Sequence, residues 1–168
     1  MSQHLSNTLL EIYLLDREDY EKLLRKMTEF EDFLENSSGA QNMDEFDEEL
    51  NDFWEIRQEC FSSLKQRARE AAGIYQQLAA KLGVPACTLY DLKPYMPEDK
   101  FQEFAGLADL LQKQMRKVLE LDGEIIPRLR TELEAVKAEL NRLQNAKNIK
   151  NVYRQKGPKD ARFIDKIK

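Results

Sequence analysis

The chain has 168 residues, a formal net charge of −5, 34% charged side chains and 42% apolar side chains. Six glycines and five prolines are too few for a sheet with many turns, and the apolar content is too high for a fully disordered chain. The values favour an all-α protein, an elongated antiparallel helical bundle or long coiled-coil hairpin of three main helices.

The first helix is expected to begin at Thr8, because Glu11 stands three residues later in the arrangement of a capping box. Apolar residues then recur at alternating steps of three and four, the heptad pattern of a packed helix. Asp16 alone interrupts this stripe, and the turn-forming residues 36–39 are expected to end the helix. The stripe consists of Leu9, Tyr13, Tyr20, Leu23, Met27, Phe30 and Leu34.

A second helix is expected from Asn42 or Asp44, where a cluster of acids suits the positive end of the helix dipole. Two cations, Arg57 and Arg67, interrupt its apolar stripe. Gly83 is well placed as the residue that terminates the helix. The stripe runs through Phe46, Leu50, Phe53, Cys60, Leu64, Ala71, Ile74 and Leu78.

The linker, residues 83–96, carries several apolar side chains, so we expect it to pack against the helices with a short turn at residues 89–93. Pro97, followed by two acids, is a strong helix start. Phe101 and Phe104 are expected to pack against the tyrosines of the linker. The third helix should cover residues 96–147, with about two further turns through residue 153.

The third stripe contains one acid, Asp122, which should be reachable by water or by a cationic neighbour. Beside Pro127 the stripe shifts by one residue and then resumes, so a kink rather than a stop is expected. Its apolar members are Phe101, Phe104, Ala108, Leu111, Met115, Val118, Ile125, Leu129, Leu133, Val136, Leu140 and Leu143.

Residues 145–168 carry eight basic and two acidic side chains, so a basic end of charge +6 follows an acidic body of charge −11. We expect residues 1–155 to form the helical domain and residues 156–168 a flexible basic tail. Tyr153 and Phe163 make a poor platform for stacking bases, and the acidic body would repel phosphate. No nucleic-acid partner is therefore expected.

The sequence lacks the residues of familiar catalytic sites. His4 is the only histidine and lies in an N-terminus expected to fray, which excludes H-E-x-x-H, Cys₂His₂ zinc and Ser-His-Asp arrangements. Glycine-rich phosphate loops are missing too. The acidic run 44–55 lacks the glycine and spacing of a calcium loop, so a solvated helix face is expected, with docking of a basic segment as the alternative. We expect no enzyme activity, no metal and no cofactor.

Cys60 and Cys87 are expected to be ordinary reduced thiols. The N-terminus lacks the basic and apolar regions of a signal peptide, and no stretch approaches the ~20 apolar residues that span a bilayer. These features favour a soluble, cytoplasmic protein.

Two apolar features could contact a partner. Trp54 stands beside Phe53, just off the stripe, and is expected at the edge of the core, with a partner contact as the alternative. The first two helices are long enough to cover only part of the third, so the far end of the third is either core or a seat for a partner helix. The candidate partner-binding residues are Leu133, Val136, Leu140, Leu143, Ile149, Val152 and Tyr153.

Two segments carry a resemblance to a known family. TLYDLKPYMPEDKFQEFAGL at residues 88–107 has a leucine-bearing turn before a Pro-Glu helix start, and VYRQKGPKDARFIDKIK at the end has a tyrosine, a flexible stretch and a terminal aromatic-Ile-Asp-Lys cluster. With two helices before the connector and one long helix after it, the layout resembles the FlgN-type flagellar export chaperones. LDGEIIPRL at residues 121–129 replaces that family's asparagine-containing repeat. The all-helical FliT-type chaperones are a neighbouring possibility.

This resemblance implies a cytoplasmic chaperone that binds the amphipathic C-terminal helix of hook–filament junction proteins before type III secretion. It also implies the export apparatus as a second partner. The family's partner-binding surface lies largely on the C-terminal helix, which corresponds here to Val136, Leu140, Leu143, Ile149 and Val152. A structural coiled-coil or adaptor protein that acts through self-assembly is the alternative, and a homodimer stays open.

Overall fold

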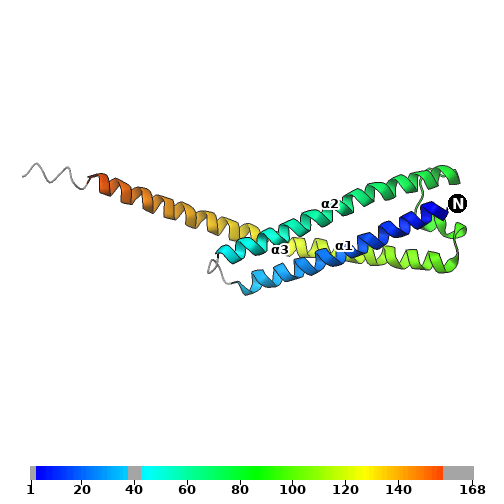
Figure 1. Ribbon diagram of the computed structural model, residues 1–168, viewed down its shortest axis with the longest axis horizontal. Helices are drawn as coiled ribbons and strands as arrows, with labels where there is room; N and C mark the ends of the chain where they lie inside the picture. Colours follow the sequence, from blue (N-terminus) through cyan, green and yellow to red (C-terminus); the bar gives the residue numbers. More distant parts are fainter. Residues whose placement is uncertain (1–2, 38–42, 157–168) are drawn as a thin grey trace, which may run out of the picture. The chain divides into compact units, whose positions relative to one another are not determined.

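The computed structural model describes residues 3–37 and 43–156, and every regular element in these ranges is helical (Figure 1). In chain order they are α1 (Gln3–Asn36), α2 (Met43–Leu82), the 3-10 helix η1 (Tyr90–Tyr95) and α3 (Glu98–Lys156). The all-α prediction is confirmed. The chain divides into two compact units, residues 1–125 and residues 126–168, and α3 contributes to both. None of the described helices is long and apolar enough to cross a membrane.

The first unit packs α1, α2 and the beginning of α3 side by side (Figure 1). One cluster joins Leu9 of α1, Leu78 of α2 and Phe104 of α3. Elsewhere Phe30 of α1 stacks on Phe53 of α2, with ring centroids 4.3 Å apart. Early residues of α1 thus lie beside late residues of α2, so these two helices are antiparallel.

The first helix begins earlier than its capping pattern predicted. α1 starts at Gln3, not at Thr8, and His4 lies within the helix rather than in a frayed end. The Thr8 hydroxyl donates a 3.0 Å hydrogen bond to the carbonyl of His4, four residues earlier. A threonine bonded in this way fits a helix interior, so its spacing to Glu11 does not mark a helix start. The predicted end of α1 is confirmed at Asn36.

The boundaries of α2 agree with the prediction. It begins at Met43, and Gly83 follows its last residue with φ +66°. The Val84 amide donates to the Ala79 carbonyl at 3.1 Å, and the Gly83 amide donates to the Ala80 carbonyl at 3.4 Å. These are the paired bonds of a Schellman motif, whose left-handed residue is adopted by glycine without a Cβ clash.

The linker packs against the first unit as predicted. Leu92 is fully buried in the core cluster. The Thr88 amide and hydroxyl both donate 2.7 Å hydrogen bonds to the Asp91 carboxylate, which fixes the first turn of η1. The Tyr90 ring meets the Phe101 ring edge to face at 6.1 Å, so this tyrosine makes the predicted contact with the start of α3.

The charged residues that interrupt the apolar stripes pair with one another in the first unit. Arg67 of α2 donates to Asp16 of α1 at 2.6 Å and also to Asp19. Arg57 of α2 donates two hydrogen bonds, of 3.2 and 2.7 Å, to the Asp122 carboxylate of α3. The cationic neighbour predicted for Asp122 is therefore confirmed as Arg57. Each pair joins two helices at the edge of the core, where a lone charge would be costly.

Burial and the neighbouring charges shift the pKa values of Arg67 and its partner Asp16 in opposite directions. Burial raises the pKa of Asp16, and Arg67 opposes that rise. Burial alone would lower the pKa of Arg67, but its hydrogen bonds to Asp19 and Asp16 raise it above the ordinary value. For Asp16 burial is the larger effect, so its pKa lies above the ordinary value of 3.8, and the 2.6 Å contact with Arg67 limits that rise.

The last helix runs without a break from Glu98 to Lys156. It continues through Pro127, as predicted, and includes the two turns predicted beyond residue 147. A kink at Pro127 and a domain boundary after residue 155 stay predictions. Residues 157–168, which make up most of the predicted tail, lie outside the described residues.

Candidate functional site

In the second unit, α3 carries the seven residues predicted to bind a partner. Six have exposed side chains, and Val136 is half-buried. Leu140 and Leu143 are 55% and 52% exposed, although they stand at heptad positions. Earlier members of the same α3 stripe, Val118 and Ile125 in the first unit, are 2% and 0% exposed. The stripe is therefore buried in one unit and open in the other.

The seven residues do not share one face of α3. Successive residues of an α-helix are rotated by about 100° around its axis. Residues 133, 136, 140 and 143 are separated by steps of three, four and three, so they lie within about 80° of one another around the helix. The step of six residues from Leu143 to Ile149 turns the helix by about 240°. Leu133, Val136, Leu140 and Leu143 form one side, the leucine face, and Ile149, Val152 and Tyr153 lie on the opposite side.

Beyond Leu143, the same side of α3 carries cations in place of leucines. Lys147, Lys150 and Arg154 follow Leu143 at steps of four, three and four, which keeps them on the same side of the helix. All three side chains are exposed. The face is thus apolar towards residue 133 and cationic towards residue 154.

A second exposed apolar feature lies in the first unit at Trp54. This side chain is 47% exposed, and its ring lies 6.5 Å from that of Phe53, at the edge of the core as predicted. The Arg57 guanidinium lies 5.5 Å from the centre of the Trp54 ring and 4.6 Å from that of Phe61. A hollow of about 420 Å³ is lined by Trp54, Arg57, Gln58, Phe61, Ser62 and Lys65.

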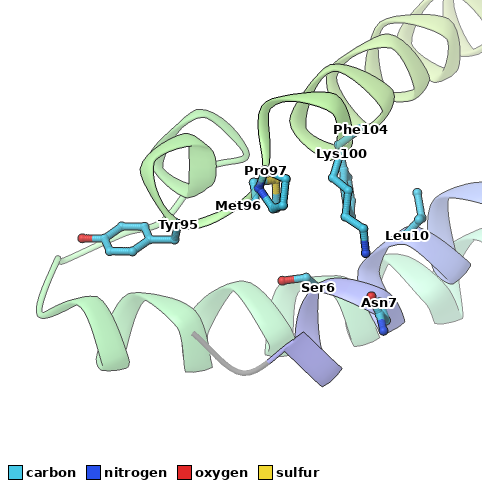
Figure 2. Close-up of a pocket in the computed structure, with 8 residues that line it drawn as sticks. All are labelled: Ser6, Asn7, Leu10, Tyr95, Met96, Pro97, Lys100 and Phe104. Atoms are coloured by element: carbon cyan, nitrogen blue, oxygen red, sulfur yellow. The ribbon is translucent and has the colours of Figure 1, made fainter.

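A smaller cavity of about 230 Å³ lies in the first unit between the first turns of α1 and the start of α3 (Figure 2). Its walls include Leu10, Met96 and Phe104, and Lys100 points towards α1 near Ser6. None of the eight lining residues is a carboxylate, histidine or thiol. The cavity is smaller than usual ligand pockets, and its lining offers no pair of groups to relay a proton or activate a nucleophile.

The two thiols and two residues of the acidic run have structural explanations. Cys60 and Cys87 are both free thiols, and burial raises the pKa of each, which disfavours the reactive thiolate. In the acidic run, Glu49 lies 3.7 Å from the buried Lys26 of α1, and Asp52 contacts the same amine. Within residues 3–37 and 43–156, no group of three or more His, Cys, Asp or Glu could hold a metal ion.

Comparison of the chain with protein-family models, with curated proteins and with solved structures gives no match. Function is therefore inferred from the exposed faces of this chain, together with the sequence resemblance described above. In the second unit, the leucine face and its cationic continuation are such a surface.

Proposed function

We propose that the chain is a non-enzymatic chaperone that binds an amphipathic helix of a client protein along the leucine face of α3. One observation carries this proposal: Leu140 and Leu143 stand at heptad positions and are more than half exposed. A stripe at heptad spacing fits a partner helix of the same spacing, because side chains of one helix enter the gaps between those of the other.

Burial of the leucine face supplies the free energy of binding. Apolar surface removed from water contributes about 25 cal/mol per Å². A client segment that is disordered when free loses conformational entropy as it folds onto the face. This loss lowers the net affinity and permits release, which suits a protein that holds a client only temporarily.

The cations beyond the leucines give the client helix a direction. Lys147, Lys150 and Arg154 form no hydrogen bond or ion pair with another described residue. We expect the client's apolar positions to lie against residues 133–143 and its acidic positions against residues 147–154.

The resemblance to FlgN-type chaperones supplies the class of client. On that resemblance, the client is the C-terminal helix of a hook–filament junction protein, held in the cytoplasm before type III secretion. The export apparatus would be the second partner. The chain's acidic body is in keeping with a protein partner rather than a nucleic acid.

The alternative is a structural or adaptor coiled coil in which the leucine face pairs with a second copy. The heptad stripe favours this reading as well, since burying it against itself also removes apolar surface from water. In a parallel pair, however, Lys147, Lys150 and Arg154 would face the same cations of the other copy, which is unfavourable.

The test titrates the full chain with a synthetic peptide of a junction protein's C-terminal helix in a calorimeter. Wild type should form a 1:1 complex. Leu140→Asp with Leu143→Asp should abolish binding while the helical circular dichroism stays unchanged, because both side chains are exposed. Ile149→Asp with Val152→Asp is the matched control on the opposite side of α3, and it should bind like wild type.

Two outcomes would reject the proposal. If the Leu140→Asp, Leu143→Asp variant binds the peptide as tightly as wild type does, the leucine face is not the client-binding site. If wild type binds no peptide and the same variant changes only the oligomer size, the self-assembly alternative is correct.

A further inference from the structure

We propose that the groove between α2 and α3 in the first unit docks an acidic amphipathic helix of a partner protein, with Trp54 as the anchor. This Trp54 groove is bordered by Trp54 and Phe61 of α2 and by Met115 and Leu119 of α3. The proposal is independent of the leucine face, which belongs to the second unit.

The Arg57–Asp122 pair fixes how the two helices face each other. Residues three and four apart lie on one side of a helix, so Trp54 and Phe61 flank Arg57 on α2. For the same reason Leu119 lies beside Asp122 on α3, and Met115 precedes Asp122 by one heptad, on the same side. The hollow itself is lined by α2, from Trp54 to Lys65. Because Arg57 and Asp122 meet through two hydrogen bonds, we infer that Met115 and Leu119 of α3 form the other side of the groove.

Neighbouring helices in the first unit leave this groove uncovered. Arg67, which pairs with α1, and Arg57, which pairs with α3, lie on opposite flanks of the buried stripe of α2. Trp54 lies beyond Arg57, on the flank away from α1. Accordingly Trp54, Met115 and Leu119 are 47%, 45% and 63% exposed.

The shape of the groove suits about three turns of helix. The hollow beside the aromatic rings extends from Trp54 to Lys65, and eleven residues of α-helix rise about 17 Å. Large exposed apolar residues that gather beside a hollow mark interaction sites, and tryptophan is the residue most enriched among interface anchors. The Arg57 guanidinium is held by Asp122 and lies against the rings of Trp54 and Phe61, which keeps that anchor in place.

The charges beside the Trp54 groove indicate which kind of helix binds there. Lys65 lines the hollow, and the exposed Arg69 lies four residues further along α2. On α3 the exposed Arg116 follows Met115, and we place both arginines beside the groove. None of the three is hydrogen-bonded or ion-paired to another described residue. Asp122 is already neutralised by Arg57. Unpaired positive charge therefore stands beside the exposed apolar side chains of the groove, which matches a helix with acidic residues beside its apolar stripe.

The same charges argue against a second copy as the occupant. Two identical surfaces related by a two-fold axis would place Lys65, Arg69 and Arg116 against the same three cations. Like charges brought together in this way oppose association.

Trp54 is the only tryptophan of the chain, so its fluorescence reports on the groove directly. The probe is a synthetic 14-residue, tryptophan-free peptide with leucine at heptad spacing and glutamate on both flanks of the leucine stripe. The matched peptide carries lysine in place of every glutamate. The glutamate peptide should shift the Trp54 emission of the full chain to the blue and saturate, and the lysine peptide should not.

Three variants locate the binding, measured by anisotropy of the labelled glutamate peptide. Trp54→Ala should weaken it roughly 30-fold, as expected for an interface anchor. Lys65→Glu with Arg69→Glu changes two exposed residues, keeps the fold and should weaken binding about tenfold. Leu140→Asp with Leu143→Asp should leave the affinity unchanged, which separates this groove from the leucine face.

The proposal is overturned if both peptides bind equally, if the Lys65→Glu, Arg69→Glu variant binds the glutamate peptide as wild type does, or if binding depends on Leu140 and Leu143. A blue shift that grows with protein concentration alone would assign the groove to a second copy. Equal competition by oligothymidylate of the same charge would reduce the groove to a general anion surface, which also rejects the proposal.

Discussion

The first unit and the second unit use the same kind of apolar stripe differently. In the first, heptad positions such as Val118 and Ile125 are buried, and the charges that interrupt the stripes are matched across helices. In the second, Leu140 and Leu143 occupy equivalent positions and are more than half exposed. Heptad spacing thus tells that a helix face is apolar, while the exposure of its side chains tells whether that face is part of a core or a surface for a partner.

The largest contrast should come from truncating one residue of the α3 stripe in each unit. Ile125→Ala removes a fully buried side chain and should lower the free energy of unfolding by about 2–5 kcal/mol. Leu140→Ala removes a half-exposed one and should change it by no more than about 0.5 kcal/mol. Urea denaturation of both full-length variants measures the difference, and equal losses would break the comparison.

Ion pairs should show the next largest contrast. Arg67→Ala leaves Asp16 and Asp19 partly buried without their cation, so we expect a loss of about 2–3 kcal/mol. Arg142 makes a similar two-bonded contact with Glu139 in the second unit, but both side chains are exposed. Arg142→Ala should leave the urea midpoint unchanged. A destabilisation by Arg142→Ala as large as that by Arg67→Ala would show that burial does not separate the two pairs.

The smallest effect concerns the hydrogen bond between the hydroxyls of Tyr13 and Tyr75, 2.7 Å apart in the first unit. Burial, and then this bond, raises the pKa of Tyr75 above its ordinary value of 10.0. The folded state therefore holds this proton more tightly than the unfolded state, so the stabilisation is complete below about pH 10 and is lost as the pH rises further. Tyr75→Phe should cost about 1 kcal/mol at pH 8 and make the decline above pH 10 shallower.

The decline should not vanish in that variant. Burial alone would lower the pKa of Lys26, but its hydrogen bond to Asp52 and the nearby acids raise it above 10.5. Stability from Lys26 is likewise present below its ordinary pKa and lost above it. Urea unfolding between pH 8 and pH 11.5 measures the contributions of Tyr75 and Lys26 to this loss of stability. Identical pH profiles for wild type and Tyr75→Phe would show that Tyr75 does not contribute to it.

Much of the fold follows from local rules that the sequence displays. Heptad spacing predicted the three long helices, and the αL preference of glycine predicted the end of α2 at Gly83. The lone acid on the third stripe predicted either water or a cation beside Asp122. Thr8 was misread because a hydroxyl that caps a helix and one that bonds back four residues have the same sequence signature.

The ion pairs between helices could not be predicted in the same way, because they depend on how the helices are aligned along one another. Nothing local says that Arg57 meets Asp122 while Arg67 meets Asp16, because each pairing requires two helices to be aligned. The Trp54 groove depends on that alignment. By contrast, the sequence alone could have shown that the seven candidate residues lie on two faces. The six residues from Leu143 to Ile149 turn an α-helix by about 240°.

Amide hydrogen exchange along α3 tests the central claim most directly, that the leucine face is open until a client helix covers it. In the full chain without peptide, amides of residues 133–154 should exchange by local opening, far faster than those of residues 104–125. The junction-protein peptide should then slow exchange over residues 133–154 alone. Uniformly slow exchange along α3 before any peptide is added would mean that the face is already covered, and would contradict the account.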